Sequence, residues 1–483
     1  MAKTIFEKHS EGRKGFTFPK NDVKVELNNC IPEKYSRKEE INLPDVSELD
    51  AMRHFFELSH MNHCIEKGFY PLGSCTMKYN PKINETLVRH DCFANLHPFQ
   101  DIDTVQGALE ILFELQKDLA EISGFANVTL QPVAGAHGEF TGLKIIHAYH
   151  KFKGNTHKKK IILPDSAHGT NPASVILNGY EVAEIKSNEK GLVDIDDLKA
   201  HVDENTAGFM LTNPNTLGLF ESQVEEIAEI IHNVDGLMYM DGANYNAIMG
   251  IVKPGENGFD IMHFNLHKTF STPHGGGGPG SGPIGVREDL VKFLPVPMIS
   301  NKDNKYYLDY SNNETSIGKV QSFYGNFAVN IKAFIYLKML GPKGLKRVAE
   351  NAVINANYIQ KSLEDYFYIQ HKDSFCMHEF IASGKWQKEK FGIKTLDIAK
   401  RILDKGYHAP TIYFPLIVPE AMMIEPTETE SKETLDEFIN AMIEIAKECE
   451  ENPDILKNAP LNTPVKRVDD TLAVRQLNVK FEW

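Results

Sequence analysis

The chain has 483 residues, 42% of them hydrophobic and 24% charged, which is typical of globular proteins and long enough for one large domain and a smaller one. Its formal net charge of −14 argues against a general affinity for nucleic acid or an anionic membrane, but is compatible with a local pocket for one phosphate. No apolar stretch approaches the roughly 20 residues of a membrane-spanning helix. The first residues lack the apolar core of a signal peptide, so we expect a cytoplasmic protein.

Residues 1–100 have an irregular pattern. Turn-forming sequences such as Leu43-Pro44-Asp45 recur here, with short helical stretches between them. His60, His63 and Cys64 lie close together, but no partner cluster has zinc-like spacing. We therefore interpret that segment as an amphipathic helix, expect no metal, and predict an N-terminal arm over residues 1–100.

The cysteines are spread over the chain without a Cys-x-x-Cys pair. This pattern predicts free thiols in a reducing compartment. The six are Cys30, Cys64, Cys75, Cys92, Cys376 and Cys449.

Alternating helix and strand patterns begin near residue 105. Gly107 to Ile122 has apolar residues at helical spacing. The short apolar runs that follow lack strict alternation, as expected for strands covered on both faces. These runs are Lys160–Pro164, Gly208–Thr212, Gly236–Asp241, Asp260–Leu266 and Gly282–Val286. They predict a large α/β domain with a mostly parallel sheet over residues 101–345.

A turn of small residues, Ala134–Gly138, precedes a helical stretch. Gly135, Ala136 and His137 would expose backbone N–H groups at a helix N-terminus, where the helix dipole favours an anion such as a phosphate. Small residues also open many helices for reasons of packing, so this signal is weak by itself.

Two polar side chains follow predicted strands. His168 lies just after the run at 160–164, where its flat ring is a candidate to stack on a planar ligand; a turn histidine bonded to the backbone is the alternative. Asn213 ends the run at 208–212 and is a candidate donor to a hydroxyl of that ligand, although a plain Asn-Pro turn competes.

The most informative segment is His263–Phe270, in which Lys268 follows a buried apolar run. Loss of hydration makes a buried lysine amine nucleophilic, which Schiff-base chemistry requires. The alternative is a lysine that extends from the strand end into solvent.

Asp241 favours the Schiff-base interpretation of Lys268. It closes the run at 236–241 and precedes Lys268 by 27 residues, which leaves room for a turn, a crossover and the next strand. Ligands of open α/β sheets lie at the carboxyl ends of parallel strands, so the two side chains would meet in one crevice. Pyridoxal phosphate (PLP) needs both, a lysine for its aldehyde and a carboxylate that keeps its pyridine nitrogen protonated. An aspartate that only caps the following turn is the alternative.

Four consecutive glycines follow the lysine within His274–Gly280. They suit a close approach of the backbone to a ligand or another chain, and a flexible loop is the alternative. The run is not a dinucleotide fingerprint, because it neither follows a strand directly nor opens a clear helix.

Helical patterns dominate after about residue 345. Within Lys432–Glu451, apolar residues including Leu435, Phe438 and Ile439 form the stripe of an amphipathic helix. We predict a smaller C-terminal α/β domain over residues 346–483.

Long motifs in this chain are similar to those of one known family. They are Gly68–Pro81, Gln131–Gly142, Ser166–Ser174, Asn265–Phe270 with His274–Gly280, and Glu425–Ser431. The lysine motif and the others resemble the glycine cleavage system P-protein, glycine dehydrogenase (decarboxylating), from Ile5 almost to the last residue. The single-chain form of that family has two homologous halves, so this chain resembles the catalytic half alone, subunit 2 of the split form.

The resemblance implies a fold and a cofactor. The fold is that of a fold-type I PLP-dependent transferase, aspartate-aminotransferase-like. The implied catalytic residues are Lys268, which forms the Schiff base, Asp241, which pairs with the pyridine nitrogen, and His168, which stacks on the ring. The predicted cofactor-binding set is Gly135, Ala136, His137, His168, Asn213, Asp241, Ala243, His267 and Lys268.

The resemblance also implies a reaction and partners. Glycine loses CO₂, and its aminomethyl group passes to the lipoyl arm of H-protein, the activity of glycine dehydrogenase (aminomethyl-transferring, decarboxylating). A separate subunit 1 would complete an α₂β₂ heterotetramer. The segment at 68–81 is a candidate lining for the channel of the lipoyl arm.

Two other functions compete. One is a PLP-dependent decarboxylase or transaminase without a lipoyl acceptor, against which the long motifs at 68–81 and 274–283 argue. The other is a non-catalytic structural or regulatory subunit that keeps only the fold, against which intact Lys268, Asp241 and His168 argue.

Overall fold

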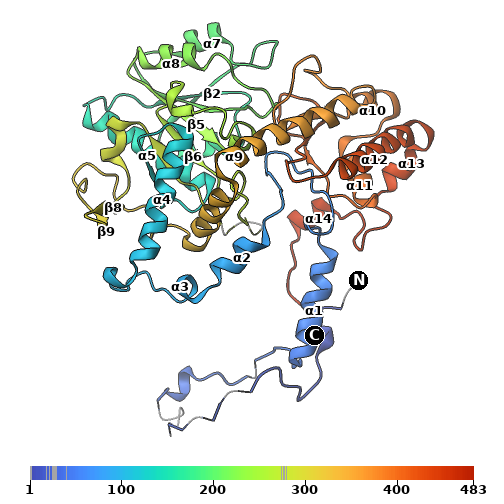
Figure 1. Cartoon of the computed structure of the whole chain (residues 1–483). Helices are drawn as coiled ribbons and strands as arrows, with labels where there is room; N and C mark the ends of the chain where they lie inside the picture. Colours follow the sequence, from blue (N-terminus) through green and yellow to red (C-terminus); the bar gives the residue numbers. More distant parts are fainter. Residues whose placement is uncertain are drawn as a thin grey trace. The chain divides into compact units, whose positions relative to one another are not determined.

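A computed structural model describes residues 3–482 except 18, 21, 24–29, 40, 274, 276, 277 and 279 (Figure 1). The chain divides into two compact units, Met1–Cys64 with Ala459–Trp483, and Ile65–Asn458. The expected domain boundaries after residues 100 and 345 remain a prediction. All six cysteines are free thiols, as predicted. Among the helices described, none combines the length and hydropathy needed to span a bilayer.

The first unit consists of short helices and extended chain. The helices are η1 (Phe6–Lys8), η3 (Glu33–Tyr35), α1 (Glu48–Met61) and α14 (Asp470–Arg475). The Ser47 hydroxyl caps α1 by accepting a hydrogen bond from the backbone N–H of Asp50. His54 is the one buried residue of α1, and the rings of Phe6 and Phe481 stack with centroids 4.7 Å apart. This unit therefore has little core of its own.

A seven-stranded sheet forms the centre of the second unit. Its order is β1-β7-β6-β5-β4-β2-β3, in which β3, β2, β4, β5 and β6 are parallel neighbours and β7 is antiparallel to both β6 and β1. The strands are β1 (Asn127–Thr129), β2 (Lys160–Pro164), β3 (Glu181–Ile185), β4 (Thr206–Thr212), β5 (Leu237–Gly242), β6 (Ile261–Phe264) and β7 (Ile284–Val286). The predicted large, mostly parallel sheet is confirmed.

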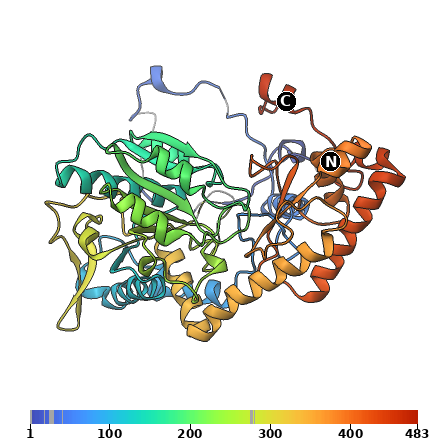
Figure 2. The ribbon, with the colours of Figure 1, turned by 90° about the horizontal axis from the view of Figure 1, so that it is seen from above.

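Helices cover both faces of this sheet (Figure 2). Alternate residues of one strand enter opposite apolar layers: Met238 and Met240 of β5 pack with α4 and α8, whereas Leu237 and Tyr239 pack with α5 and α6. The helices are α4 (Gln106–Ser123), α5 (Gly135–Phe152), α6 (Asn171–Leu177), α7 (Ile195–His201) and α8 (Val224–His232). Both faces of the central strands are therefore apolar, which explains their continuous hydrophobic runs.

Short elements connect and border the large sheet. Before it lie α2 (Lys82–Val88), α3 (Asp91–Ala94) and η4 (Ile102–Thr104). After β5 come η5 (Tyr245–Ala247) and η6 (Pro254–Glu256), and after β7 come η7 (Glu288–Phe293) and the hairpin of β8 (Met298–Lys302) and β9 (Lys305–Asp309).

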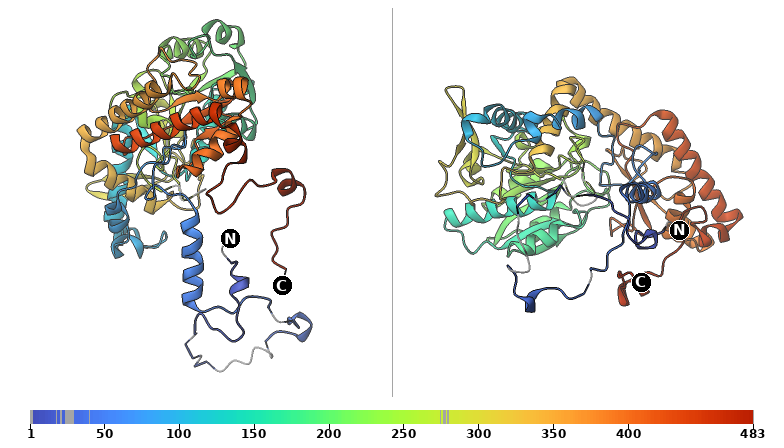
Figure 3. Two further views of the ribbon diagram at one scale, coloured as in Figure 1. Left: turned by 90° about the vertical axis from the view of Figure 1, so that its right-hand side faces the viewer. Right: turned by 90° about the horizontal axis from the view of Figure 1, so that it is seen from below.

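A second core surrounds a small antiparallel sheet of order β10-β12-β11. The long helix α9 (Phe327–Leu363) contributes to the cores of both sheets and changes direction at Gly341, which precedes Pro342 (Figure 3). The remaining elements are β10 (Phe380–Ser383), α10 (Lys385–Phe391), α11 (Thr395–Asp404), β11 (Thr411–Ile412), β12 (Ala421–Ile424), α12 (Lys432–Glu451) and α13 (Pro453–Asn458). The predicted amphipathic helix is α12, whose apolar face packs on this sheet and on α9.

The segment at 68–81 is fixed against the small sheet. Gly73 donates its N–H to the Met423 carbonyl of β12 at 3.1 Å, and a Cβ atom on Gly73 would lie 2.5 Å from that oxygen. Only glycine fits this approach.

Lys78 holds this segment to four other parts of the unit. Its fully buried ammonium group donates to Asn246 Oδ1 and the Thr269 carbonyl, both at 2.8 Å, to the Tyr336 hydroxyl at 3.2 Å, and to Glu428 Oε1 at 2.7 Å. Burial lowers the pKa of Lys78, but the Glu428 carboxylate outweighs it and the pKa is raised. Lys78 therefore stays charged and links the segment at 68–81 to the loop of Lys268.

Replacing Lys78 with methionine should destabilise the protein by about 3–5 kcal/mol, because the change leaves the buried Glu428 carboxylate without its cation. Urea denaturation measures this loss. The control is Lys432→Met, which breaks an exposed ion pair with Asp436 and should barely move the denaturation midpoint. Equal midpoints for the two variants would contradict the role given to Lys78.

Candidate functional site

The carboxyl ends of four parallel strands meet at one edge of the large sheet. His168 follows β2, Asn213 follows β4, Asp241 is the penultimate residue of β5, and Lys268 lies four residues after the end of β6. The N-terminus of α5 opens at Gly135. This is the edge at which open α/β sheets bind ligands.

Asp241 is fully buried, yet its carboxylate is held in the ionised form. Asn171 Nδ2 donates to Oδ2 at 2.9 Å, and the Ala243 N–H donates to Oδ1 at 2.9 Å. His263 Nε2 lies 3.2 Å from Oδ1. Burial raises the pKa of Asp241, but the nearby His263 and His168 and the two hydrogen bonds outweigh it and lower the pKa to about 2. Asp241 is therefore a fixed negative charge at the strand end.

Tyr239 and His263 extend this site behind Asp241. The Tyr239 hydroxyl lies 2.8 Å from His263 Nδ1, and both side chains are fully buried. If the hydroxyl donates to Nδ1, the ring proton is on Nε2, facing Asp241. Sequence reasoning gave neither residue a role; the signal was a histidine within the otherwise apolar run of β6.

His168, Asp241 and Glu139 lie close together. One nitrogen or carboxylate oxygen of each lies within 4.8 Å of the others. The His168 N–H donates to Thr212 Oγ1 at 3.3 Å, and its Nδ1 lies 3.2 Å from Thr170 Oγ1. Burial lowers the pKa of His168 more than Asp241 raises it, so the ring is neutral at neutral pH and available for stacking.

Lys268 is buried and lines a cavity of about 710 Å³. Within the described part of the chain, its ammonium nitrogen forms no hydrogen bond or ion pair. The cavity is lined by Cys75, Val133, Ala134, His267, Lys268, Gly278, Gly280, Gln321, Gly325 and Asn326. A buried amine in a cavity, unpaired among the residues that the structure describes, indicates a ligand site.

A hollow of similar size, about 720 Å³, is lined by residues of α4 and α9 such as Asp118 and Lys338. It is lined by none of the residues that end the parallel strands. We therefore place the functional site at the Lys268 cavity and not here.

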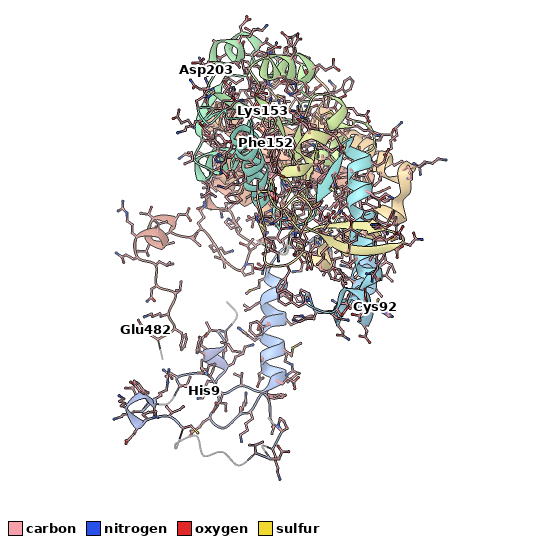
Figure 4. The ribbon with its side chains drawn as sticks, turned by 90° about the vertical axis from the view of Figure 1, so that its left-hand side faces the viewer. His9, Cys92, Phe152, Lys153, Asp203 and Glu482 are labelled. Atoms are coloured by element: carbon pink, nitrogen blue, oxygen red, sulfur yellow. The ribbon has the colours of Figure 1, made fainter. Side chains whose placement is uncertain are left out.

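The first turn of α5 faces the same cavity through Ala134. No side chain among the described residues caps this helix, so the N–H groups of Gly135, Ala136 and His137 are available to an anion. A Cβ atom on Gly135 would lie 2.5 Å from Asn265 Oδ1, so glycine is required for this approach. Phe152 and Lys153, labelled in Figure 4, mark the opposite end of the helix.

Three other predicted residues have defined positions. Ala243 acts through its N–H on Asp241. His267 lines the cavity, and its Nδ1 accepts a hydrogen bond from the Ser281 N–H at 3.4 Å. Both amide atoms of Asn213 bond to the Glu221 backbone, at 3.0 and 3.3 Å, so they hold the loop after β4. A bond from Asn213 to a ligand hydroxyl remains a prediction.

The glycine-rich motif is described only in part. His274, Gly276, Gly277 and Pro279 lie outside the described residues. Gly278 and Gly280 line the cavity, which is where a close backbone approach was expected.

Three functional candidates come from the small sheet, and of these only Glu425 lies in a motif noted in the sequence. His378, Glu379 and Glu425 are fully buried, and one nitrogen or carboxylate oxygen of each lies within 4.8 Å of the others. The charge of Lys268 lowers the pKa of all three. Only pairing of β10 with β12 brings them together.

Two family models match the chain. "Aminotransferase class-V" matches residues 142–321, which include the large sheet from α5 and the Lys268 loop. "Glycine dehydrogenase, C-terminal domain" matches residues 348–463, which include the small sheet.

Curated relatives match almost the whole chain. A Bacillus cytotoxicus protein named "Probable glycine dehydrogenase (decarboxylating) subunit 2" is 56% identical over 479 residues, covering 99% of this chain and 97% of the relative. A Bacillus thuringiensis protein of the same name is 57% identical over 478 residues, with the same coverage of each chain.

Solved structures share the fold. The crystal structure of a glycine decarboxylase (P-protein) of the glycine cleavage system, in inhibitor-bound form, has a TM-score of 0.72 and 19% identity, and covers 87% of this chain and 94% of its own. A NifS-like protein has a TM-score of 0.61 and 14% identity, with 79% and 99% covered. The predicted aminotransferase-like fold class is confirmed.

The Tyr239–His263 contact gives a test of the site's construction. Tyr239→Phe should lower the free energy of unfolding by about 1–3 kcal/mol, because it leaves His263 Nδ1 buried without a partner. The control is Tyr180→Phe, since the buried Tyr180 hydroxyl has no partner among the described residues and its removal should cost nothing. Urea denaturation that gives equal losses for both variants would rule out the Tyr239–His263 hydrogen bond.

Proposed function

Because the chain belongs to the glycine dehydrogenase (decarboxylating) subunit 2 family, we propose that it is the catalytic, PLP-binding subunit of a two-subunit enzyme of the glycine cleavage system. It decarboxylates glycine and transfers the aminomethyl group to the lipoyl arm of H-protein. The observation that carries this proposal is Lys268, which is buried, has no partner among the described residues, and lines a cavity that Ala134 at the N-terminus of α5 also lines. Asp241 lies at the end of β5, the neighbour of the strand β6 that precedes Lys268.

The residues present fit PLP in three respects. Lys268 offers an amine for the aldehyde, the first-turn N–H groups of α5 suit the phosphate, and ionised Asp241 can hold a proton on the pyridine nitrogen. His168, uncharged and beside Asp241, can cover one face of the ring. When bound, PLP supplies a ring that accepts the electrons released as CO₂ leaves.

The roles of the side chains follow from their charges. Asp241 keeps its negative charge at neutral pH because its pKa is about 2, so it retains a proton placed opposite it. The hydrogen bonds from Asn171 and the Ala243 N–H fix the Asp241 carboxylate in one orientation, and His263 Nε2 lies 3.2 Å from Oδ1. Lys268, once its amine is released, is the basic group in the cavity and can give or take a proton.

The overall reaction consumes one proton. Glycine, as ⁺H₃N–CH₂–COO⁻, reacts with the lipoyl disulfide and H⁺ to give CO₂, ⁺H₃N–CH₂–S–R and HS–R′. The bond between the α-carbon and the carboxylate breaks, a carbon–sulfur bond forms, and the sulfur–sulfur bond breaks. The leaving sulfur takes the proton, so the site has to hold and deliver one in each turnover.

The proposal includes the partners and location of the chain. The name "subunit 2" of the relatives supports assembly with a subunit 1, and an α₂β₂ heterotetramer is the expected form. Free thiols throughout support a reducing compartment such as the cytoplasm. The segment at 68–81 contributes Cys75 to the cavity, which supports its proposed place along the path of the lipoyl arm.

The cofactor role of Lys268 is tested by spectroscopy. The purified chain loaded with PLP should show a visible band that borohydride bleaches, with the label on the Lys268 peptide in mass spectrometry. Lys268→Ala should lack both. Lys158→Ala is the control, because Lys158 is also buried but binds the carbonyls of Glu204, Thr206 and Val234 at the opposite strand ends. A trapped label on another lysine would refute the assignment, and no band in any variant would favour a non-catalytic subunit.

The reaction is tested by exchange of labelled CO₂ into the carboxyl group of glycine. Exchange should need lipoylated H-protein and subunit 1, and Asp241→Asn should slow it by at least about 10²-fold, since the ring nitrogen loses its anionic partner. Decarboxylation at full rate without H-protein would instead indicate a PLP decarboxylase without a lipoyl acceptor. Aminotransfer from glycine to a keto acid would indicate a transaminase.

A further inference from the structure

A second cluster of charged residues lies on the small-sheet side of Lys268. Glu379 directly precedes β10 and Glu425 directly follows β12. Phe380 pairs with Ile424 in the antiparallel ladder, so the next pair along it is Glu379 with Glu425. His378 Nε2 lies 3.9 Å from Oε1 of each carboxylate. The strand register therefore places two carboxyl groups side by side in the interior.

Two negative charges are not stable in this place. Both glutamates are fully buried, and neither has a lysine or arginine at ion-pair distance within the described part of the chain. Burial, and the proximity of Glu425, raise the pKa of Glu379 well above its ordinary value. Burial raises the pKa of Glu425 to about 7. Burial, with Lys268 adding to it, lowers the pKa of His378 to about 3, so the imidazole is uncharged and cannot balance them.

Hydrogen bonds nevertheless favour one negative charge here. Glu379 accepts from the Ser74 N–H at 2.6 Å and from Asn244 Nδ2 at 3.3 Å. Glu425 accepts from the N–H of Thr76 at 2.9 Å and from its hydroxyl at 2.6 Å. Ser74 and Thr76 both have positive φ, 63° and 49°, a conformation that costs energy in residues other than glycine. The backbone of the segment at 68–81 is thus strained at the residues whose donors point at the pair.

His378 provides an independent indication that the cluster holds a proton. Both its ring nitrogens are buried and have no hydrogen-bond partner among the residues that the structure describes, although a neutral imidazole carries one donor and one acceptor. An unpaired imidazole beside two carboxyl groups is suited to contact a proton held by either of them.

We propose that Glu379 and Glu425 carry one proton between them and so present a single negative charge to Lys268, which makes the pair a positioning group for the reactive amine. This rests on the proposed cofactor role of Lys268 but not on the choice of substrate. Other charged or titratable groups around the pair are His378, Cys75 and Glu428, of which Glu428 is paired with Lys78. Lys268 is therefore the one cation facing the pair among the described residues.

A proton suits the cluster better than a metal ion does. All four carboxylate oxygens already accept hydrogen bonds from Ser74, Thr76 and Asn244. A divalent ion would compete with these donors for the oxygens, whereas a proton adds one donor and removes none.

The number of protons can be counted by infrared spectroscopy on the full chain after metal chelation. At neutral pH the wild type should show the C=O stretch of one buried, protonated carboxyl group. The double variant Glu379→Gln/Glu425→Gln should abolish it, and in Glu379→Gln the band of the remaining Glu425 should disappear as the pH rises through about 7. Glu221→Gln, at another buried glutamate, should leave the wild-type band unchanged. A band that survives in the double variant, that is absent from the wild type, or that appears only on chelation would overturn the proposal.

The pH dependence of stability gives a second test, and the direction of the change is defined. The pKa of Glu425 rises from an ordinary 4.5 to about 7 on folding, so between these values the folded chain binds more protons than the unfolded chain. This stabilisation is complete below about pH 4.5 and is lost as the pH rises through about 7. The denaturation midpoint of the wild type should therefore fall over this range relative to that of Glu425→Gln. Parallel curves would contradict a titrating pair.

The effect on Lys268 is measured by the pH dependence of its reaction with PLP. The double variant Glu379→Gln/Glu425→Gln removes the negative charge, so the midpoint of this reaction should move to lower pH. Each single variant keeps one charge and should stay close to the wild type at neutral pH, as should Glu221→Gln. An unchanged midpoint in the double variant would overturn the positioning role. A chain that forms no PLP band at all would refute the proposed function, while the infrared count still decides whether the pair shares a proton.

Discussion

The strand-end site depends on Asp241 remaining ionised where no water reaches it. An isolated carboxylate in such a place would take up a proton. Asn171, the Ala243 N–H and His263 supply the interactions that replace water. Each comes from a different part of the sheet edge, from the start of α6, the turn after β5 and β6 itself. The parallel arrangement of the strands is therefore what makes a permanent negative charge possible here.

The two buried carboxylate sites, Asp241 and the Glu379–Glu425 pair, differ in charge. The nearby His263 and His168 lower the pKa of Asp241 to about 2 in spite of its burial. Burial raises the pKa of Glu425 to about 7. One sheet thus contributes a fixed charge and the other a proton that can be exchanged near neutral pH. A pair of groups with pKa values pushed apart in this way is typical of sites that carry out acid–base chemistry.

The parts of the site that follow from local patterns could be predicted from the sequence. Lys268 and Asp241 each follow a continuous apolar run, and runs of that kind become the fully buried β5 and β6. β3 escaped prediction because it is an edge strand with exposed glutamates, and β1 because it has only three residues. His378, Glu379 and Glu425 could not be predicted, since their proximity arises from the register of β10 with β12 and from the fold of the segment at 68–81. For Asn213, the position at a strand end could be predicted from the sequence, but the hydrogen bonds that its amide makes to Glu221 could not.

The hydrogen bonds from Thr76 to Glu425 also constrain how the chain is made. They join residues 349 apart in sequence, so during synthesis the segment at 68–81 leaves the ribosome long before its partner exists. Contacts of such high sequence separation form late and slowly. The seven-stranded sheet is complete at β7 and can fold first. The carboxylates that accept hydrogen bonds from Ser74 and Thr76 are in place only after β12 has joined β10, so nothing stabilises positive φ at these two residues before then. The buried acid pair is therefore among the last features to form, and a chain truncated before Glu425 would keep the sheet that bears Lys268 but lack the pair.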